Sequence, residues 1–280
     1  MKVGGLGFAK RIAFAVIGLG VFAFFARHID FHQLAHSLRE MNPMLAIAAM
    51  VVVLIGKVGA KIFRSQRLLE AECARVGMAA PTLATTARLL YASHAAGQLA
   101  WGPLGFTVRT VALKADGLPL GTIARVHLKE RIAEGAGILA VAFVAIAPLG
   151  PVQLAAALIG LVLLIDLTFT YTRATAWSFA SSLADILVLA LATHAMHVDA
   201  GLAPIVVGFL AINAAYLLPT PGQLGVQEAA IVLAFATAGI PAPAALACAL
   251  AYRAAHLVPL AVVGIPALVA TTLHRKEAIA

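Results

Sequence analysis

The stretch Pro219-Thr-Pro-Gly-Gln-Leu-Gly-Val-Gln-Glu228 interrupts a chain that is otherwise largely apolar. Proline lacks the backbone N–H that a helix interior needs, so Pro221 is expected to end the preceding helix. Gly222 and Gly225 allow tight turns and a close approach of the backbone, and a new helix is expected to begin near Leu224. The free N–H groups at a helix start form an anion site, and a lipid phosphate is the natural anion for a chain this apolar.

A related motif occurs about 120 residues earlier in the chain. The earlier copy lies within residues 98–131 and contains Gly102-Pro-Leu-Gly105, Gly117-Leu-Pro119 and Arg131. The later copy lies within residues 219–253 and contains Gly222-Gln-Leu-Gly225, Gly239-Ile-Pro241 and Arg253. A lone Pro-Gly turn would indicate an ordinary connection between helices, but the duplication favours a functional site. Internal repeats with interrupted hydrophobic segments are typical of transporters, whose sites lie at the repeat interface.

The composition excludes a soluble protein. Hydrophobic residues make up 62% of the chain and charged residues 11%, whereas soluble domains have about 45–50% and about 25%. We therefore expect an all-α, polytopic integral membrane protein, with residues 1–280 forming a single transmembrane domain. The net charge of +8 does not indicate a nucleic-acid partner, because the basic residues cluster between apolar segments, as the positive-inside rule predicts.

A helix that crosses a bilayer needs about 20 apolar residues, and the chain has room for about eight. The expected spans are 10–27, 44–63, 83–101, 119–147, 151–171, 176–197, 202–218 and 241–271. Segments 103–116 and 221–238 are short or interrupted, and we expect them to be broken or re-entrant within two related halves, shielded by protein or water. Eight full spans make the halves parallel, and a crossing at 103–116 makes them inverted.

The basic residues also predict an orientation. Lys2, Lys10 and Arg11 precede the first apolar segment, which has no clear cleavage site and is read as a retained helix. Arg275 and Lys276 lie near the last residue. A third basic group surrounds the second loop and is expected on the same, cytoplasmic side: Lys57, Lys61, Arg64, Arg67, Arg75 and Arg88. With eight spans, both ends are expected in the cytoplasm of a bacterium, with the protein in its inner membrane.

No motif for catalysis, a metal or a cofactor is recognisable, so we expect none of the three and predict that the protein is not an enzyme. Cys73 is expected in a charged loop and Cys248 in an apolar helix, which does not indicate a disulfide or metal pair. His28, His32 and His36 are spaced four apart, but no acidic or cysteine partner accompanies them, and an interfacial loop is the better interpretation.

The predicted span 119–147 carries an unusual concentration of charge, at Arg125, Lys129, Glu130, Arg131 and Glu134. An unpaired charge at the bilayer centre costs roughly 2.5–3.5 kcal/mol. The cluster is therefore either a solvated helix end or the polar lining of a cavity. Glu130 and Glu134 share one helical face and need a nearby cation if both are charged.

Arg253 is the clearest isolated charge. It lies a dozen residues into an apolar segment without another formal charge, too deep to reach the headgroups easily. A buried partner is expected, and Glu228 is the best candidate. The arginine then either fastens two helices together or binds an anion from a cavity.

The Pro-Gly-Gln-Leu-Gly-x-x-Glu stretch resembles the transmembrane, flippase-like region of lysylphosphatidylglycerol synthases and its standalone relatives, most strongly over 84–140 and 176–270. The matching residues of the second motif are Pro221, Gly222, Leu224, Gly225, Glu228, Gly239, Pro241 and Arg253, and those of the first are Gly105, Arg109, Glu130 and Arg131. Glu134 stands where the family has Asp, Gln223 replaces a Gly, and Phe106 replaces an acid.

The resemblance implies a bacterial inner-membrane protein that handles a lipid or a lipid-linked molecule by moving it between leaflets. The anionic head group of that lipid would be bound by Arg109, Arg131 and Arg253, together with the helix starts at the glycine-proline motifs. When no lipid is bound, Glu130 and Glu228 would hold the arginines. An ion- or proton-coupled carrier of small solutes is an alternative. A further alternative is a membrane subunit that positions a partner glycosyl- or acyltransferase. The sequence does not indicate an oligomeric state.

Overall fold

The computed structural model describes residues 38–99, 102–146, 151–215 and 225–279, together with His32 and His36. Side chains at 99, 102–103, 143–172 and 272–279 are outside this description. The expected first span at 10–27 therefore lies outside the described residues, as do Pro221 and Gly222.

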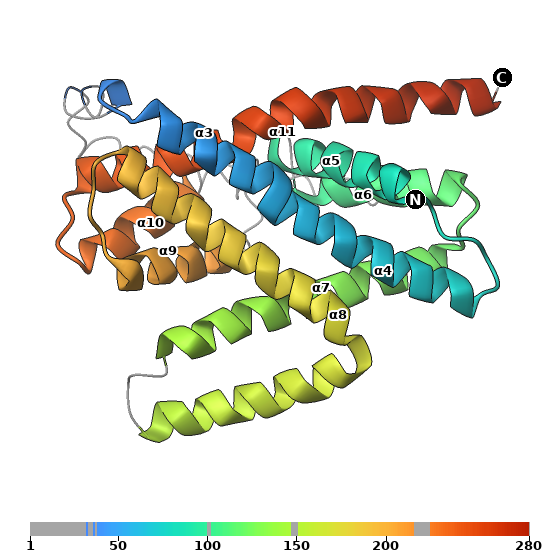
Figure 1. The fold of residues 1–280 in the computed structure, drawn as a ribbon. Coiled ribbons are helices and arrows are strands. Elements are labelled where there is room, and N and C mark those ends of the chain that lie inside the picture. Colours follow the sequence, from blue (N-terminus) through green and yellow to red (C-terminus); the bar gives the residue numbers. More distant parts are fainter. Residues whose placement is uncertain are drawn as a thin grey trace, which may run out of the picture. The chain divides into compact units, whose positions relative to one another are not determined.

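All regular structure in the described ranges is helical (Figure 1). In chain order the elements are α3 (Pro43–Val51), the π-helical segment η1 (Val52–Val58), α4 (Gly59–Arg75), α5 (Leu83–Leu99), α6 (Gly102–Ala115), α7 (Leu120–Ile146), α8 (Pro151–Ala195), α9 (Leu202–Ala215), α10 (Val226–Ala236) and α11 (Ala242–Ile279). Three segments of the described chain are long and apolar enough to cross a membrane: Pro43–Arg75, Arg173–Ala195 and Ala242–Thr271. The protein is a helical membrane protein.

Two helices are longer than the sequence predicts. The helix of the second span continues through α4 to Arg75, because residues 64–75 are rich in helix-forming Arg, Leu, Glu and Ala. Cys73 therefore lies in a helix and is fully buried, and the prediction that it lies in a loop was wrong. The backbone is also helical throughout Pro151–Ala195, so the connection between the predicted spans 151–171 and 176–197 is helical.

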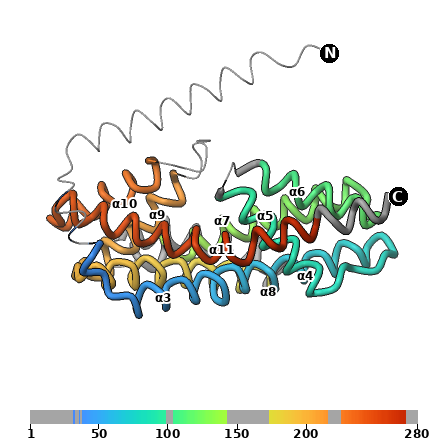
Figure 2. The backbone as a smooth tube through the Cα atoms, turned by 90° about the horizontal axis from the view of Figure 1, so that it is seen from above, coloured from blue at the N-terminus to red at the C-terminus, as the bar shows by residue number. Residues whose placement is uncertain are grey.

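The chain forms two compact units, each assembled from separate segments. Unit 1 comprises Met1–Met50, Gly97–Pro103 and Ile186–Val258, and unit 2 comprises Val51–Ala96, Leu104–Asp185 and Pro259–Ala280. In unit 1, α9 packs along α10, and the two helices lie side by side in both backbone views (Figure 2). Phe235 and Ile212 are fully buried there.

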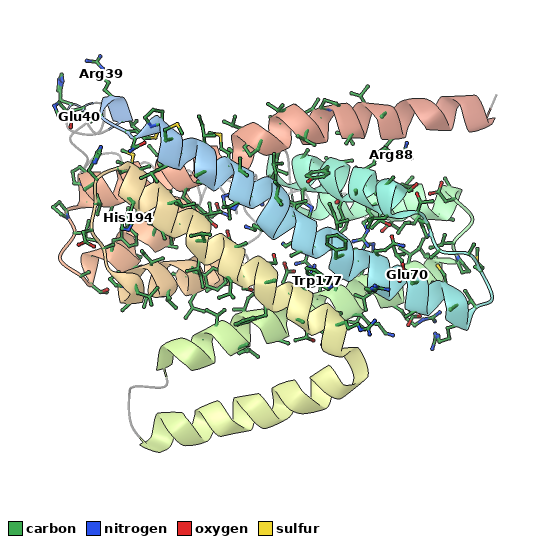
Figure 3. The ribbon with its side chains drawn as sticks, viewed as in Figure 1. Arg39, Glu40, Glu70, Arg88, Trp177 and His194 are labelled. Atoms are coloured by element: carbon green, nitrogen blue, oxygen red, sulfur yellow. The ribbon has the colours of Figure 1, made fainter. Side chains whose placement is uncertain are left out.

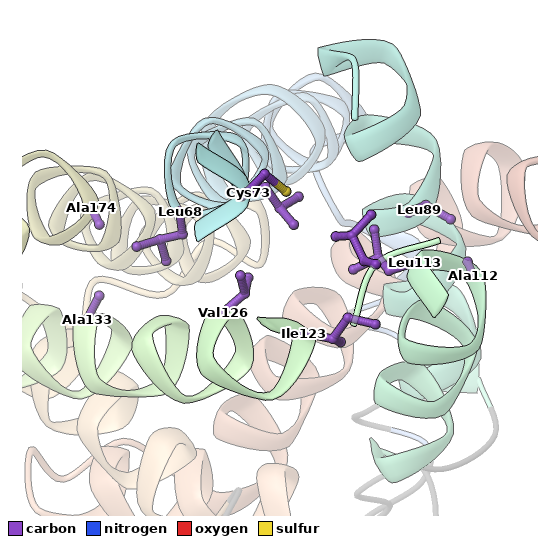
Figure 4. Packing of buried hydrophobic residues seen from close by; sticks show 11 residues of the cluster. Leu68, Cys73, Leu89, Ala112, Leu113, Ile123, Val126, Ala133 and Ala174 are labelled. Atoms are coloured by element: carbon purple, nitrogen blue, oxygen red, sulfur yellow. The ribbon is translucent and has the colours of Figure 1, made fainter. Parts of the chain in front are cut away.

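The core of unit 2 is built mainly by α4, α6 and α7. Figure 4 shows Leu68 and Cys73 of α4 facing Val126 of α7, with Leu113 of α6 nearby. α8 joins through Trp177 (Figure 3). The ring of Trp177 stacks on that of Phe63, with centroids 4.9 Å apart. These contacts hold the polar residues of α4 and α7 in place.

The Gly-x-Pro elements of the two motifs form the same turn. Gly117 has φ +89° and Gly239 has φ +74°, a left-handed conformation that glycine adopts without strain. In each turn the residue after the glycine donates its N–H to a carbonyl of the preceding helix, Leu118 to Leu113 at 3.0 Å and Ile240 to Phe235 at 3.2 Å. This is the hydrogen bond of a Schellman cap. The proline that follows directly precedes the next helix, and its carbonyl accepts an N–H from the first turn, Ile123 to Pro119 at 3.1 Å and Ala245 to Pro241 at 3.0 Å.

α7 and α8 cross at a glycine. A Cβ added to Gly137 would lie 2.9 Å from the carbonyl carbon of Ser178 and 3.0 Å from its oxygen. Small residues at crossings let helix backbones approach closely in membrane proteins. Gly135, two residues earlier on the same helix, has open space where its Cβ would be.

We predict that Gly137→Ala destabilises the protein by about 1–3 kcal/mol, the usual cost of overpacking, because the backbone of α8 would have to move. The midpoint of thermal unfolding in detergent would fall. Gly135→Ala is the matched control, and it should leave the midpoint unchanged or raise it, since alanine is the better helix former. Equal midpoints for the two variants would contradict the close crossing.

Candidate functional site

The polar residues of unit 2 gather between α4, α7 and their neighbours. α4 packs against α7, and the helix that runs from η1 into α4 presents one polar stripe whose members recur at helical spacing: Lys57, Lys61, Arg64, Ser65 and Glu72. Four of these are buried, and Lys61 is half-buried. Residues three, four and seven apart share one helix face, so the stripe is a consequence of the sequence spacing once the helix extends to Arg75.

Arg109 of α6 and Glu130 of α7 form a bidentate ion pair. Nη1 and Nη2 of Arg109 donate to the two carboxylate oxygens of Glu130 at 2.7 and 2.8 Å. The hydroxyl of Ser65 donates to the same carboxylate. Arg109 and Glu130 are each only 4% exposed, so the pair is shielded from solvent, and two parallel hydrogen bonds fix its geometry.

Glu134, one turn further along α7, has two cationic partners. Lys61 Nζ lies 2.8 Å from Oε1, and Arg131 Nη1 lies 2.5 Å from Oε2. The guanidinium of Arg131 also lies 4.4 Å from the centre of the Phe106 ring, a cation–π contact. Glu130 and Glu134 therefore both have the cations that their shared helical face requires.

A second charged group in unit 2 surrounds Glu72, which is 2% exposed. Arg125 Nε donates to its carboxylate at 2.8 Å, Lys129 Nζ also contacts it, and Arg75 Nε lies 3.4 Å away. The three cationic side chains are partly exposed. The charge cluster predicted on α7 thus divides, with Arg125 and Lys129 on a partly exposed edge and Glu130 in the interior.

In unit 1 the second motif forms an ion pair of its own. Arg253 Nη1 of α11 donates to Glu228 Oε1 of α10 at 2.5 Å, which confirms the predicted pairing. The other carboxylate oxygen, Oε2, accepts the backbone N–H of Gly225 at 2.8 Å. Gly225 has φ +81° and precedes α10, so the helix begins two residues after the expected position at Leu224. Glu228 is 5% exposed and the side chain of Arg253 12%.

Arg131 and Arg253 occupy equivalent places in the two motifs, but their surroundings differ. Arg131 is 58% exposed at its side chain and pairs with a residue of its own helix. The pair in unit 2 that corresponds to Arg253–Glu228 in its contacts is Arg109–Glu130. In this pair the arginine and the carboxylate have changed places between the short and the long helix. In unit 2 the short helix α6 carries the arginine, whereas in unit 1 the short helix α10 carries the carboxylate. Arg131 and Arg253 are thus equivalent in sequence position and differ in their surroundings.

Sequence reasoning took the basic residues of α4 only as markers of membrane orientation. Lys57 instead forms a buried ion pair with Asp185 of α8 at 2.7 Å, and Arg64 Nη1 donates to the Ser178 hydroxyl at 3.0 Å. The signal was present, because these positions recur every three or four residues. Their partners lie more than 100 residues away in sequence, and local spacing does not identify them.

The remaining candidates do not assemble into a chemical centre in the described ranges. Cys73 and Cys248 are free thiols. His32 and His36 are helical, so the expectation of a loop was wrong for these two residues. His36 also has an acidic partner, since its Nδ1 lies 3.2 Å from a carboxylate oxygen of Glu40. Among the residues that the structure describes, no group of three or more His, Cys, Asp or Glu side chains could hold a metal ion.

Residues 166–264 match the family of the lysylphosphatidylglycerol synthase transmembrane region. This confirms the resemblance for the part of the chain that contains Gly225, Glu228 and Arg253. The first motif, which includes Arg109 and Glu130, precedes the matched residues. No curated protein shows significant similarity to the chain.

We predict that Arg253→Ala destabilises the protein far more than Arg131→Ala. Removing Arg253 leaves the Glu228 carboxylate buried without that cation, which costs about 3–5 kcal/mol for a buried pair. Arg131 is exposed, and exposed pairs contribute about 0–1 kcal/mol. Thermal unfolding midpoints in detergent measure the difference.

The double variant Arg253→Ala/Glu228→Gln is the control, because it removes the stranded charge as well. Its midpoint should lie above that of Arg253→Ala alone. If the double variant is no more stable than Arg253→Ala, the stability lost in Arg253→Ala does not come from breaking the ion pair.

Proposed function

We propose that this protein binds a membrane lipid with an anionic head group and moves it between leaflets. The proposal starts from the match of residues 166–264 to the lysylphosphatidylglycerol synthase transmembrane region. The observation that carries the proposal is the buried Arg253–Glu228 pair, which places a permanent cation inside a helix apolar enough to span a membrane. Such intramembrane charges mark substrate pathways in transport proteins.

The proposed mechanism uses competition for an arginine. In the absence of lipid, Glu228 and Glu130 hold Arg253 and Arg109. The phosphate of a head group offers the same fork-shaped acceptor that a carboxylate offers, so it can take the place of the carboxylate at the guanidinium. The displaced carboxylate then needs a proton or water, because a buried charge that loses its partner costs about 3–5 kcal/mol.

The short helices support a site within the membrane. α6 has 14 residues and α10 has 11, which correspond to about 21 and 16 Å at 1.5 Å per residue. Both are shorter than the hydrocarbon core, which is about 30 Å thick. We propose that they are the re-entrant or broken segments of two related halves, a construction that places substrate sites near the bilayer midplane.

We also propose a membrane topology of about eight spans in a bacterial inner membrane, with both chain ends in the cytoplasm. The basic residues near Lys10 and Arg275 support this orientation. The same turn chemistry at Gly117 and Gly239 supports the relation between the two halves.

We predict that the purified protein, reconstituted into vesicles with fluorescently labelled phosphatidylglycerol, speeds the exchange of that lipid between leaflets. Dithionite quenching of the outer leaflet measures the rate. Arg253→Ala should slow the exchange by roughly tenfold or more, because a hydrogen bond to a charged group contributes about 1.5–3 kcal/mol. Arg253→Lys keeps the charge and should retain part of the rate.

Arg67→Ala is the matched control, because Arg67 forms an exposed pair with Glu70. This variant should exchange lipid as fast as the unaltered protein. Exchange no faster than in protein-free vesicles would sink the proposal. Uptake of a soluble solute driven by a pH gradient, without lipid movement, would favour a coupled carrier instead.

A further inference from the structure

We propose that Arg64 is the main phosphate-binding residue of unit 2, and that Arg109 and Arg131 are held by carboxylates. This inference deepens the proposed function, because it names the cation that meets the phosphate of a head group. Sequence reasoning assigned that part to Arg109 and Arg131 and left Arg64 out.

Arg64 is a buried cation that makes no direct ion pair among the described residues, although the charges of Glu130 and Glu134 act on it from further away. It is 5% exposed, and within the described residues no carboxylate oxygen lies within the 4.0 Å limit of an ion pair with it. Its guanidinium donates from Nη1 to the neutral hydroxyl of Ser178 at 3.0 Å. Its Nε is buried and has no hydrogen-bond partner in the same part of the chain.

The surrounding charges do not balance. We define the inner cluster as six side chains of α4, α6 and α7, namely Lys61, Arg64, Arg109, Glu130, Arg131 and Glu134. Four of the six are cations and two are carboxylates. Glu130 is occupied by Arg109 and Ser65, and Glu134 by Lys61 and Arg131. Of these four cations, Arg64 is thus the one that contacts no carboxylate directly in the described part of the chain, and its guanidinium donates to a hydroxyl instead.

Arg64 cannot relieve this imbalance by losing its proton, since arginine stays charged at any pH at which proteins fold. A buried ion without a partner costs several kcal/mol, and a protein retains one where the charge has a use. The neighbouring Lys57–Asp185 pair shows the alternative, in which a cation of the same helix face is matched by a carboxylate. At Arg64 the matching anion comes from outside the chain.

A phosphate group fits this position best. Guanidinium binds phosphate through two parallel hydrogen bonds, and the unpartnered Nε together with an adjacent Nη supplies one such pair of donors. Ser178 leaves a lone pair for Arg64 because its own proton goes to the carbonyl of Ala174 at 3.1 Å. The phosphate can belong to a lipid head group or be free in solution, and both sources share this chemistry.

The test measures the thermal unfolding midpoint of the detergent-purified full chain in a titration with dihexanoyl phosphatidylglycerol, inorganic phosphate or sodium chloride of equal ionic strength. The unaltered protein should be stabilised by the lipid, by inorganic phosphate or by both, and not by chloride. Arg64→Gln should weaken the apparent affinity roughly tenfold to hundredfold, the loss expected for a hydrogen bond to a charged group. Arg64→Lys should retain part of it.

The midpoint without any phosphate distinguishes a binding site from a structural contact. Arg64→Gln removes an uncompensated buried charge, so it should unfold at the same or a higher temperature than the unaltered protein. Arg67→Gln, three residues away and exposed, is the matched control and should change neither the midpoint nor the affinity. A lower midpoint for Arg64→Gln with unchanged phosphate stabilisation would overturn the inference.

Stabilisation by dihexanoyl phosphatidylglycerol alone identifies a lipid source, and stabilisation by inorganic phosphate alone identifies a free anion. Either result supports the phosphate site provided that Arg64→Gln abolishes it. Lipid exchange in vesicles is measured separately. Phosphate binding that depends on Arg64, in a protein that moves no lipid, supports this inference and rejects the proposed function. If Arg64→Gln still exchanges lipid and still binds phosphate as the unaltered protein does, the result supports the proposed function and rejects this inference.

Discussion

The fold depends on one physical requirement, which is that every charge inside an apolar helix assembly needs a partner. Water is scarce there, and breaking a buried pair costs about 3–5 kcal/mol. Arg109–Glu130 in unit 2 and Arg253–Glu228 in unit 1 meet the requirement with short contacts between a short helix and the long helix after it. Each pair therefore fixes how its two helices pack as well as its own geometry.

Glycine makes these pairs reachable. Gly117 and Gly239 turn the chain through a left-handed residue, so that each long helix folds back against the short one before it. Gly137 brings α7 against the backbone of α8 at Ser178, beside the side chain of Arg64. Close backbone approach replaces the hydrophobic driving force that helices lack among lipid tails, and it also shortens the distance between polar side chains.

Reversed polarity gives the two units different chemical characters. Unit 1 has a carboxylate at the start of its short helix, where Glu228 also caps the N–H of Gly225. Unit 2 has the arginine on its short helix and a surplus of cations along α4 and α7. In each unit an arginine is held by a carboxylate, and the proposed translocation requires a phosphate to compete with that carboxylate.

Sequence alone determined the membrane class, the helix boundaries set by Gly and Pro, and the pairing of Arg253 with Glu228. All three follow from local chemistry, since apolar runs, turn residues and an isolated deep charge have few solutions. The tertiary structure decided which of several cations each carboxylate of α7 contacts. Arg109 reaches Glu130 across 21 residues and Lys57 reaches Asp185 across 128. Such partners depend on which helix faces meet, because electrostatic attraction acts through space and not along the chain.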